Sequence, residues 1–253
     1  MINILKKKLQ SLFKSAGYKL FSLFHGPINK VPINEPNKYF HINEINIDKI
    51  KSYYIYLIKK GRLYTDRVHN ATVIQNNSII SGASYQYGYE NNMTIKFGIE
   101  KNLVIKNGTP RKKKKIKGRV FSMLSGGAAN KNYFHWMFDV LPRLALIEGK
   151  FNLRDIDFFL LPNTKEKFQK QTLSELNISS KKWLSSEKFR HIESDEILVT
   201  DHPYASENLT NDIQNIPFWI SKWLKVKFIS KKTVESNFKK KNLYKKNKKI
   251  NGQ

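Results

Sequence analysis

Apolar and polar residues along the chain follow four successive patterns. Over residues 1–26 apolar side chains recur every three or four positions and lysines interrupt them, which predicts a basic amphipathic helix. Its apolar positions are Leu5, Leu9, Leu12, Phe13, Ala16, Leu20 and Phe24. No apolar run reaches the about 18 residues that a membrane-spanning helix needs. The helix is therefore expected to lie either in a membrane interface, with its lysines facing anionic lipid, or on the surface of the domain.

Short β-type runs dominate residues 27–110. Prolines and asparagines over 27–45 predict a loop, and the later runs predict a β-rich N-terminal layer. The expected strands are 53–58, 72–75, 78–80 and 93–97. The basic run 111–119 that follows is expected to be a solvated loop, with an electropositive patch beside an anionic ligand as the alternative.

An α/β pattern covers residues 111–228, and alternating strands and helices favour a mostly parallel sheet. The expected strands are 120–124, 157–161 and 196–199. The expected helices are 132–148, 165–176 and 216–227. Residues 229–253 are rich in Lys and Asn and cannot bury a core, so a disordered tail or a solvated helix is expected there.

Charge narrows the choice of partners. The chain of 253 residues has 46 Lys and Arg against 20 Asp and Glu, a net charge of +26. An anionic partner explains this excess, and so does A/T-rich coding, which favours Lys, Asn and Ile. Most of the excess is Lys, whereas nucleic-acid interfaces favour Arg, so nucleic acid is not the expected partner. The chain has no cysteine, which excludes disulfides and cysteine-based zinc sites.

Candidate chemistry concentrates in residues 126–144. A glycine-containing turn leads into the helix, Asn130 or Asn132 can cap it, and the free N–H groups there can face an anion. Trp136 belongs to the apolar stripe of this helix. Pro142 removes a backbone hydrogen bond, so it is expected to kink or split the helix.

One face of this helix carries three ionisable residues. His135, Asp139 and Arg143 are spaced four residues apart, so their side chains are neighbours. An Asp and an Arg at this spacing also form ordinary surface ion pairs, and a His beside a Trp is often half-buried structure. Spacing alone therefore leaves catalysis and structure as alternatives.

The same segment resembles a known signature. The run Asn132-Tyr133-Phe134-His135-Trp136, then Asp139, then Leu141-Pro142-Arg143-Leu144 is similar to the motif of family 61 glycosyltransferases, many of which are capsular polysaccharide biosynthesis proteins of bacteria. Weaker similarities lie at 62–86, 168–176 and 195–203, so the resemblance covers roughly residues 55–228.

The resemblance implies a fold and a reaction. The fold would be of the GT-B kind, with an N-terminal Rossmann-like domain preceded by the β-rich layer. The reaction would be metal-independent, cofactor-free, inverting transfer of a sugar from a nucleotide-sugar donor to a hydroxyl of a glycan acceptor. His135 or Asp139 would be the base and the other would orient it; the sequence does not choose between them. The expected substrate-binding residues are Asn132, Tyr133, Trp136 and Arg143, the last holding either an acidic group or the helix face.

Family members continue into a second, donor-binding half, for which residues 228–232 offer only a partial match, with Lys in place of Arg, and the residues after them offer none. We therefore expect the second domain to be largely missing, through a frameshift or a split gene. The chain alone is then expected to lack full activity, unless a separate chain supplies the missing half. The expected location is cytoplasmic, with peripheral contact at an anionic inner membrane. The main rival hypothesis is a non-catalytic basic protein that binds nucleic acid or anionic membrane, supported by the net charge. A hydrolase is disfavoured because the chain has no Gly-x-Ser-x-Gly motif.

Overall fold

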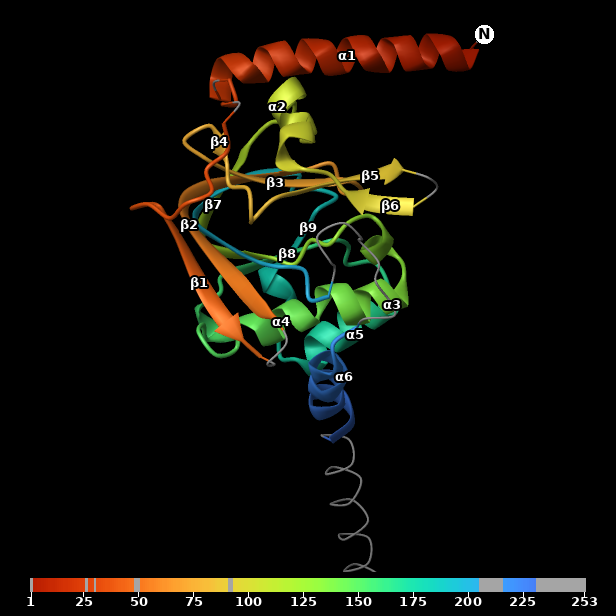
Figure 1. Ribbon diagram of the computed structural model, residues 1–253. Coiled ribbons are helices and arrows are strands. Elements are labelled where there is room, and N and C mark those ends of the chain that lie inside the picture. Colours follow the sequence, from red (N-terminus) through yellow and green to blue (C-terminus); the bar gives the residue numbers. More distant parts are fainter. Residues whose placement is uncertain are drawn as a thin grey trace, which may run out of the picture.

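The computed structural model describes residues 2–25, 27–29, 31–47, 51–90, 93–204 and 216–230 (Figure 1). The predicted tail lies outside the described residues from position 231 onward. A ten-stranded mixed sheet forms the centre, in the order β6-β5-β3-β2-β10-β7-β8-β9, with β1 beside β2 and β4 beside β3. The strands are β1 Phe40–Asn46, β2 Ser52–Thr65, β3 Asn70–Gln75, β4 Ser78–Ile79, β5 Tyr85–Glu90, β6 Met93–Lys96, β7 Lys114–Ser122, β8 Phe158–Leu161, β9 Trp183–Ser185 and β10 His191–Thr200. The α-helices are α1 Ile2–His25, α2 Leu103–Asn107, α3 Tyr133–His135, α4 Pro142–Ile147, α5 Lys167–Glu175 and α6 Phe218–Leu224.

The long strand β2 joins the two regions that the sequence divides at residue 110. It pairs antiparallel with β10, from Ile55 opposite Thr200 to Tyr64 opposite His191. Its other edge holds β1 and β3. The chain is therefore of the mixed α/β kind, but its β-rich part does not form a separate layer, because both parts share one sheet.

Only one side of the sheet is parallel. The parallel pairs are β10 with β7, β7 with β8, and β8 with β9. The pairs formed by β1 to β6 and by β2 with β10 are antiparallel. The expectation of a mostly parallel sheet is correct only for the segment that alternates with helices, because antiparallel neighbours need no helical crossover.

The two faces of the sheet bury separate apolar clusters. Alternation along β7 places Val120 in one cluster and Phe121 in the other, as the period of two in a strand requires. The cluster around Val120 takes residues from β2 and β3 as well as from β8 and β10, so the sheet curls around it. The cluster around Phe121 lies under the helices that connect β7 to β8 and β8 to β9. Figure 1 shows α3, α4, α5 and α6 on this side.

Two local predictions are wrong. The basic run 111–119 is not a loop, because β7 begins at Lys114 within it. Two of its charges have partners on the neighbouring strand β10: Arg119 pairs with Glu196 at 2.6 Å, and Lys113 pairs with Glu193. The predicted loop 27–45 gives way to β1 at residue 40, where the backbone pairs antiparallel with β2.

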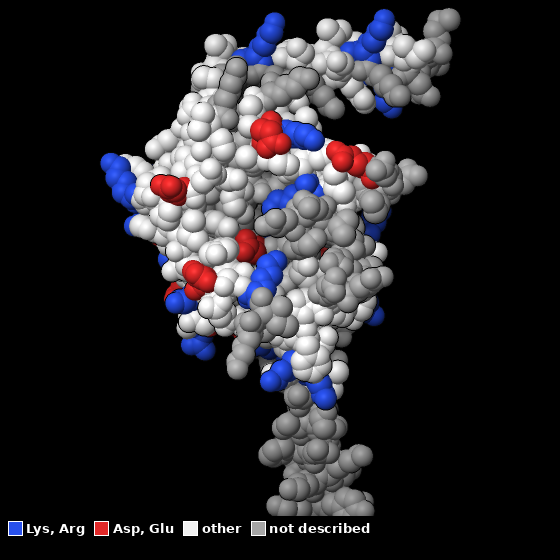
Figure 2. Space-filling view, in the orientation of Figure 1, with Lys and Arg blue, Asp and Glu red and all other residues white. Residues whose placement is uncertain are grey.

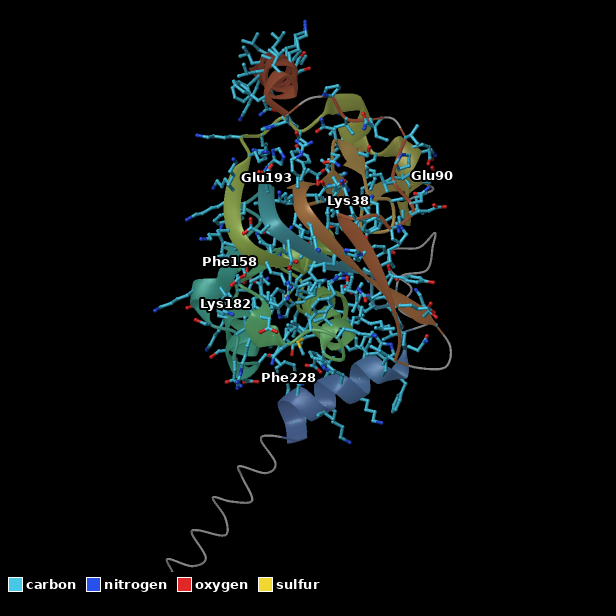
Figure 3. All side chains as sticks on the ribbon, turned by 90° about the vertical axis from the view of Figure 1, so that its left-hand side faces the viewer. Lys38, Glu90, Phe158, Lys182, Glu193 and Phe228 are labelled. Carbon is cyan, nitrogen blue, oxygen red and sulfur yellow. The ribbon has the colours of Figure 1, made fainter. Side chains whose placement is uncertain are left out.

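Helix α1 lies across the end of the molecule opposite α6 (Figure 1). Figure 3, which views the molecule from the side, shows α1 end-on above the sheet with its side chains projecting around it. Of the helices in the described residues, none is long and apolar enough to cross a membrane.

Candidate active site

On the parallel side of the sheet, the order of the strands reverses between β7 and β10. From β7 the chain passes outward to β8 and β9, and it then returns to the other side of β7 to form β10. Open α/β sheets bind ligands outside the carboxyl ends of the strands between which the order reverses. Here these strands are β7 and β10, which end at Ser122 and Thr200. A site is therefore expected among the residues that follow them.

The turn after β7 is fastened to the antiparallel strands. Gly126 has a φ of +98°, a left-handed conformation that favours glycine, and its amide donates to the Tyr85 hydroxyl at 3.0 Å. The Gly127 amide donates to the carbonyl of Val68 at 2.9 Å. Both amides therefore have partners within the protein.

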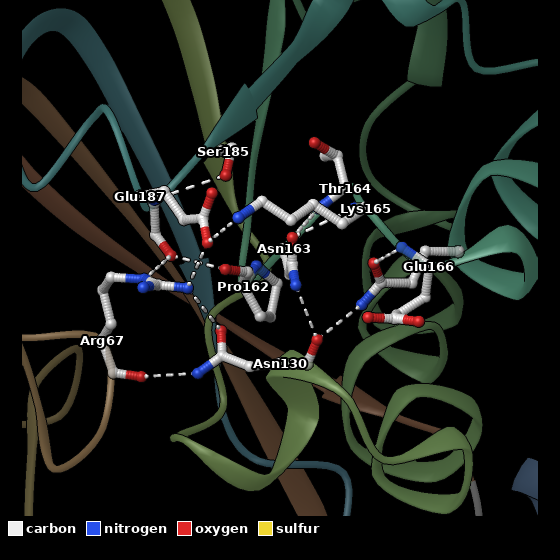
Figure 4. Close-up of polar contacts among 11 residues, drawn as sticks. Arg67, Asn130, Pro162, Asn163, Thr164, Lys165, Glu166, Ser185 and Glu187 are labelled. Carbon is white, nitrogen blue, oxygen red and sulfur yellow. Dashed lines mark hydrogen bonds and ion pairs between the residues drawn. The ribbon is translucent and has the colours of Figure 1, made fainter.

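Asn130 fastens the same segment to the loop after β8, to helix α5 and again to the loop after β2 (Figure 4). Its carbonyl accepts hydrogen bonds from Asn163 at 3.0 Å and Gln169 at 3.2 Å. Its side-chain amide donates to the carbonyl of Arg67 at 3.2 Å, and the Arg67 guanidinium pairs with Glu187 at 3.4 Å. These paired polar groups fix the start of the helix that carries the ionisable residues.

The helix itself is interrupted at its centre. A π-helical turn, Trp136–Val140, is closed by a 3.1 Å hydrogen bond from the amide of Leu141. Pro142 has no amide hydrogen and begins α4, while Leu141 before it keeps helical dihedral angles. The helix is therefore interrupted by the π turn without a break in the chain, and Arg143 lies in the first turn of α4. Single π turns inside α-helices are frequent at functional sites.

A buried carboxylate forms the centre of the site. Asp139 Oδ2 lies 2.8 Å from His135 Nδ1 and 3.7 Å from His202 Nε2, and Oδ1 accepts a hydrogen bond from the Tyr204 hydroxyl at 2.7 Å. Burial raises the pKa of Asp139, but the hydrogen bonds from His135 and His202 outweigh it and lower the pKa to about 2. Asp139 is therefore ionised at neutral pH, with its oxygens already occupied.

The imidazoles of His135 and His202, both beside Asp139, differ in how many of their ring nitrogens have a partner within the described residues. His202 accepts from the Tyr204 amide through Nδ1 at 3.3 Å while Nε2 faces Asp139, and burial lowers its pKa. His135 uses only Nδ1, because no described residue hydrogen-bonds its Nε2. With the proton on Nδ1, Nε2 of His135 carries a basic lone pair. Of the two bases considered from sequence, the geometry favours His135, with Asp139 as its orienting partner.

Two of the expected substrate-binding residues have other roles. Trp136 is fully buried in the helix-side core, and its Nε1 donates to Thr172 Oγ1 at 2.9 Å. It is a core residue, because the apolar stripe of the helix faces the sheet. Asn132 caps the helix, since its Oδ1 accepts from a first-turn amide at 2.9 Å.

The other two expected substrate-binding residues, Tyr133 and Arg143, differ in their exposure to solvent. Tyr133 is exposed, and its ring meets that of Phe168 edge-on at a centroid distance of 5.2 Å. Arg143 is buried and ties α4 to β10: Nε donates to the carbonyl of Asp139 at 3.1 Å, and Nη1 donates to that of Thr200 at 2.8 Å. The structure thus gathers His135, Asp139 and Arg143, but it does not bring all four expected substrate-binding residues to one surface.

His202 and Tyr204 belong to this site and were not among the residues chosen from sequence. They follow β10 directly, in the run Asp201-His202-Pro203-Tyr204. Polar residues directly after a buried strand can indicate a functional site from sequence. Here they indicate it only once β10 is known to lie beside β7.

Acid is expected to destabilise the protein through Asp139. The pKa of Asp139 is about 2 in the folded protein, against an ordinary value of 3.8. Ionised Asp139 therefore stabilises the fold fully above its pKa in the unfolded chain, and this stabilisation is lost as pH falls through its pKa in the folded protein. The shift corresponds to roughly 2 kcal/mol. Urea unfolding at a series of pH values measures the free energy of unfolding of wild type and of Asp139→Asn. The difference between the two is expected to decrease between about pH 4 and pH 2. A difference that stays constant over this window would contradict the ionised assignment.

Within the described residues, no group of three or more metal-ligating side chains is placed to hold a metal ion. Comparisons of the chain with protein-family models, with curated proteins and with solved structures found no match.

Proposed function

We propose that the protein is a glycosyltransferase that moves a sugar from a nucleotide-sugar to a glycan acceptor in surface or capsular polysaccharide synthesis. The observation that carries this proposal is the His135–Asp139 pair, 2.8 Å apart, on a helix at the carboxyl edge of the parallel strands. The pair lies inside the segment that resembles family 61 glycosyltransferases. A GT-B arrangement, in which this chain supplies the acceptor-side domain, belongs to the same proposal.

In this reaction His135 is the general base. Nε2 takes the proton of the acceptor hydroxyl as its oxygen attacks the anomeric carbon from the face opposite the leaving group. The bond from the anomeric carbon to the donor phosphate breaks, and the nucleoside diphosphate leaves with the electron pair, so the configuration inverts. Asp139 holds the imidazole in the Nδ1–H tautomer and stabilises the imidazolium that forms.

A panel of nucleotide-sugars tests the proposal. Calorimetry with the full chain measures donor binding, and a coupled assay measures release of the nucleoside diphosphate in the presence of glycan acceptors. Release that requires both donor and acceptor supports the proposal. A folded chain that transfers no sugar from any donor of the panel, both alone and together with the separate chain expected to supply the donor-binding half, would contradict it.

One feature favours an anionic membrane as a further partner. The apolar stripe of α1 is not packed: Leu9 is 59%, Leu12 67% and Phe13 83% exposed. A groove of about 1390 Å³ separates the stripe from α2 and the sheet. Lys6 and Lys19 flank the stripe, and α1 has no acidic residue. We propose that α1 lies in the membrane interface. There, burial of the apolar stripe and attraction of the lysines to anionic lipid both contribute to the free energy of binding.

Vesicle binding measures this attachment. Phe13→Asp is expected to weaken binding to phosphatidylglycerol-containing vesicles about tenfold or more, because it removes apolar burial and adds a repelled charge. Phe218→Asp is the matched control, since Phe218 is 79% exposed on α6 at the opposite end of the molecule. Equal binding of the two variants in a sedimentation assay would argue against α1 as the membrane contact.

Nucleic acid is a poorer partner for the same charges. Figure 2 shows basic side chains spread over the visible face and not gathered in one stripe. Three of the seven arginines are engaged within the protein: Arg143 is buried, and Arg67 and Arg119 form ion pairs with glutamates.

A further inference from the structure

A polar pocket lies at the switch between β7 and β10. It has a volume of about 280 Å³, and its wall includes Ser122 at the end of β7, Thr200 at the end of β10 and Tyr87 of β5. His202 also lines it, so the pocket adjoins the site around Asp139. Nothing in the proposed base catalysis uses this pocket.

Arg143 lines the pocket with an incompletely bonded guanidinium. Nε and Nη1 donate to backbone carbonyls, but no described residue accepts a hydrogen bond from Nη2. Asp139 and Asp201 lie near enough to stabilise the charge of Arg143, but no described carboxylate forms an ion pair with it, and the residue is only 3% exposed. Burial without a direct ion pair is costly for a cation, and a bound anion reduces that cost.

The surroundings of Arg143 suit an oxyanion attached to a sugar. The rings of Tyr85 and Tyr87 stack at a centroid distance of 4.4 Å in the pocket wall. Burial raises the pKa of both phenols, so their hydroxyls stay protonated and can donate hydrogen bonds. Lys51 and Lys96 add positive charge at the same pocket.

One carboxylate also lines the pocket, and its oxygens face β2. Asp201 accepts hydrogen bonds from the Tyr54 amide at 2.9 Å and from the Tyr56 hydroxyl at 3.3 Å. With Arg143, Lys51 and Lys96 against Asp201, cationic groups outnumber the acidic one in the pocket wall.

We propose that the Arg143 pocket binds the oxyanion of an acidic sugar, so that the acceptor glycan carries a carboxylate or phosphate on the residue seated there. Its volume, about 280 Å³, lies just below the range of about 300–1,000 Å³ typical of drug-sized ligands. The pocket therefore takes one sugar ring and not a whole nucleotide-sugar. The inference rests on the proposed function only in naming this ligand as the acceptor.

Binding of simple sugars to the full chain, without donor, tests the pocket. The probes are methyl glucuronide, methyl glucoside and glucose 6-phosphate, followed by ligand-detected NMR. Methyl glucuronide or glucose 6-phosphate is expected to bind at least about tenfold more tightly than methyl glucoside. The tighter of the two acidic probes assigns the oxyanion to a carboxylate or to a phosphate.

Charge reversal at the pocket supplies the matched variants. Lys96 is exposed, so Lys96→Glu leaves the core intact and is expected to weaken acidic-sugar binding by roughly threefold to tenfold. Lys181→Glu makes the same charge change before β9, outside the pocket, and should leave binding unchanged. Methyl glucoside binding should not respond to either variant.

Two results would overturn the inference: equal binding of acidic and neutral sugars, or equal effects of Lys96→Glu and Lys181→Glu. These results are separable from failure of the proposed function. His135-dependent transfer to neutral acceptors, without preference for acidic ones, would leave the glycosyltransferase proposal standing and reject the pocket. Selective binding of acidic sugars in a chain that transfers nothing, both alone and with the separate chain expected to supply the donor-binding half, would do the reverse.

Discussion

Replacing His135 with glutamine is expected to lower kcat for sugar transfer by about 10²- to 10⁴-fold, the usual contribution of a general base. Glutamine can still donate a hydrogen bond to Asp139, but its amide cannot accept the hydroxyl proton at neutral pH. Because His135 is only partly buried, the variant should unfold at nearly the same denaturant concentration as wild type. Steady-state kinetics with a productive donor and acceptor would give kcat and KM separately, and KM is expected to change little.

The controls for His135 use the rest of the chain. His41→Gln makes the same substitution at an exposed position on β1 and should retain full activity. Asp139→Asn should reduce kcat as well, because an amide does not stabilise the imidazolium. Wild-type kcat in His135→Gln would reject His135 as the base.

The largest expected loss of stability comes from Trp136→Ala. Trp136 is fully buried between the helix and the sheet, so its truncation is expected to reduce the free energy of unfolding by about 3–5 kcal/mol. The change also removes the 2.9 Å hydrogen bond to Thr172. Urea denaturation followed by far-UV circular dichroism measures the effect. Tyr133→Ala, at the exposed neighbouring position, should cost far less.

This experiment also separates the two roles considered for Trp136. Trp136→Phe keeps most of the apolar volume and should recover much of the stability, although it leaves Thr172 without its indole partner. A Trp136→Ala protein with wild-type stability and impaired acceptor binding would return Trp136 to the substrate-binding residues.

The strands that the sequence predicted well are those whose apolar residues dominate. The run at 157–161 became β8 and the run at 196–199 lies within β10, because each is buried on both faces. The first half of β7 was missed because its residues are mainly lysines. Its strand conformation depends on pairing with β10, whose Glu193 and Glu196 offset that charge, and pairing between distant segments leaves no local pattern.

The candidate site was predictable in its local part only. His135 and Asp139 share a helix face by their spacing, and the structure confirms their contact. The contact of His202 with Asp139 depends on β10 lying beside β7, which a single sequence does not reveal. Local pattern also could not distinguish an indole that faces a ligand from one that faces the core, because both occupy the apolar stripe of a helix.

The pairing of β2 with β10 has a consequence for how the chain is made on the ribosome. The amide of Tyr54 meets the Asp201 carboxylate across 147 positions of sequence, so one edge of β2 stays unpaired while most of the chain is synthesised. During that time β1 and β3 can protect only the opposite edge. An open strand edge recruits other strands, so we expect the nascent protein to be prone to association through β2 until β10 emerges. The residues that complete the surroundings of Asp139 emerge immediately after it, so the site is assembled in the same step that closes the sheet.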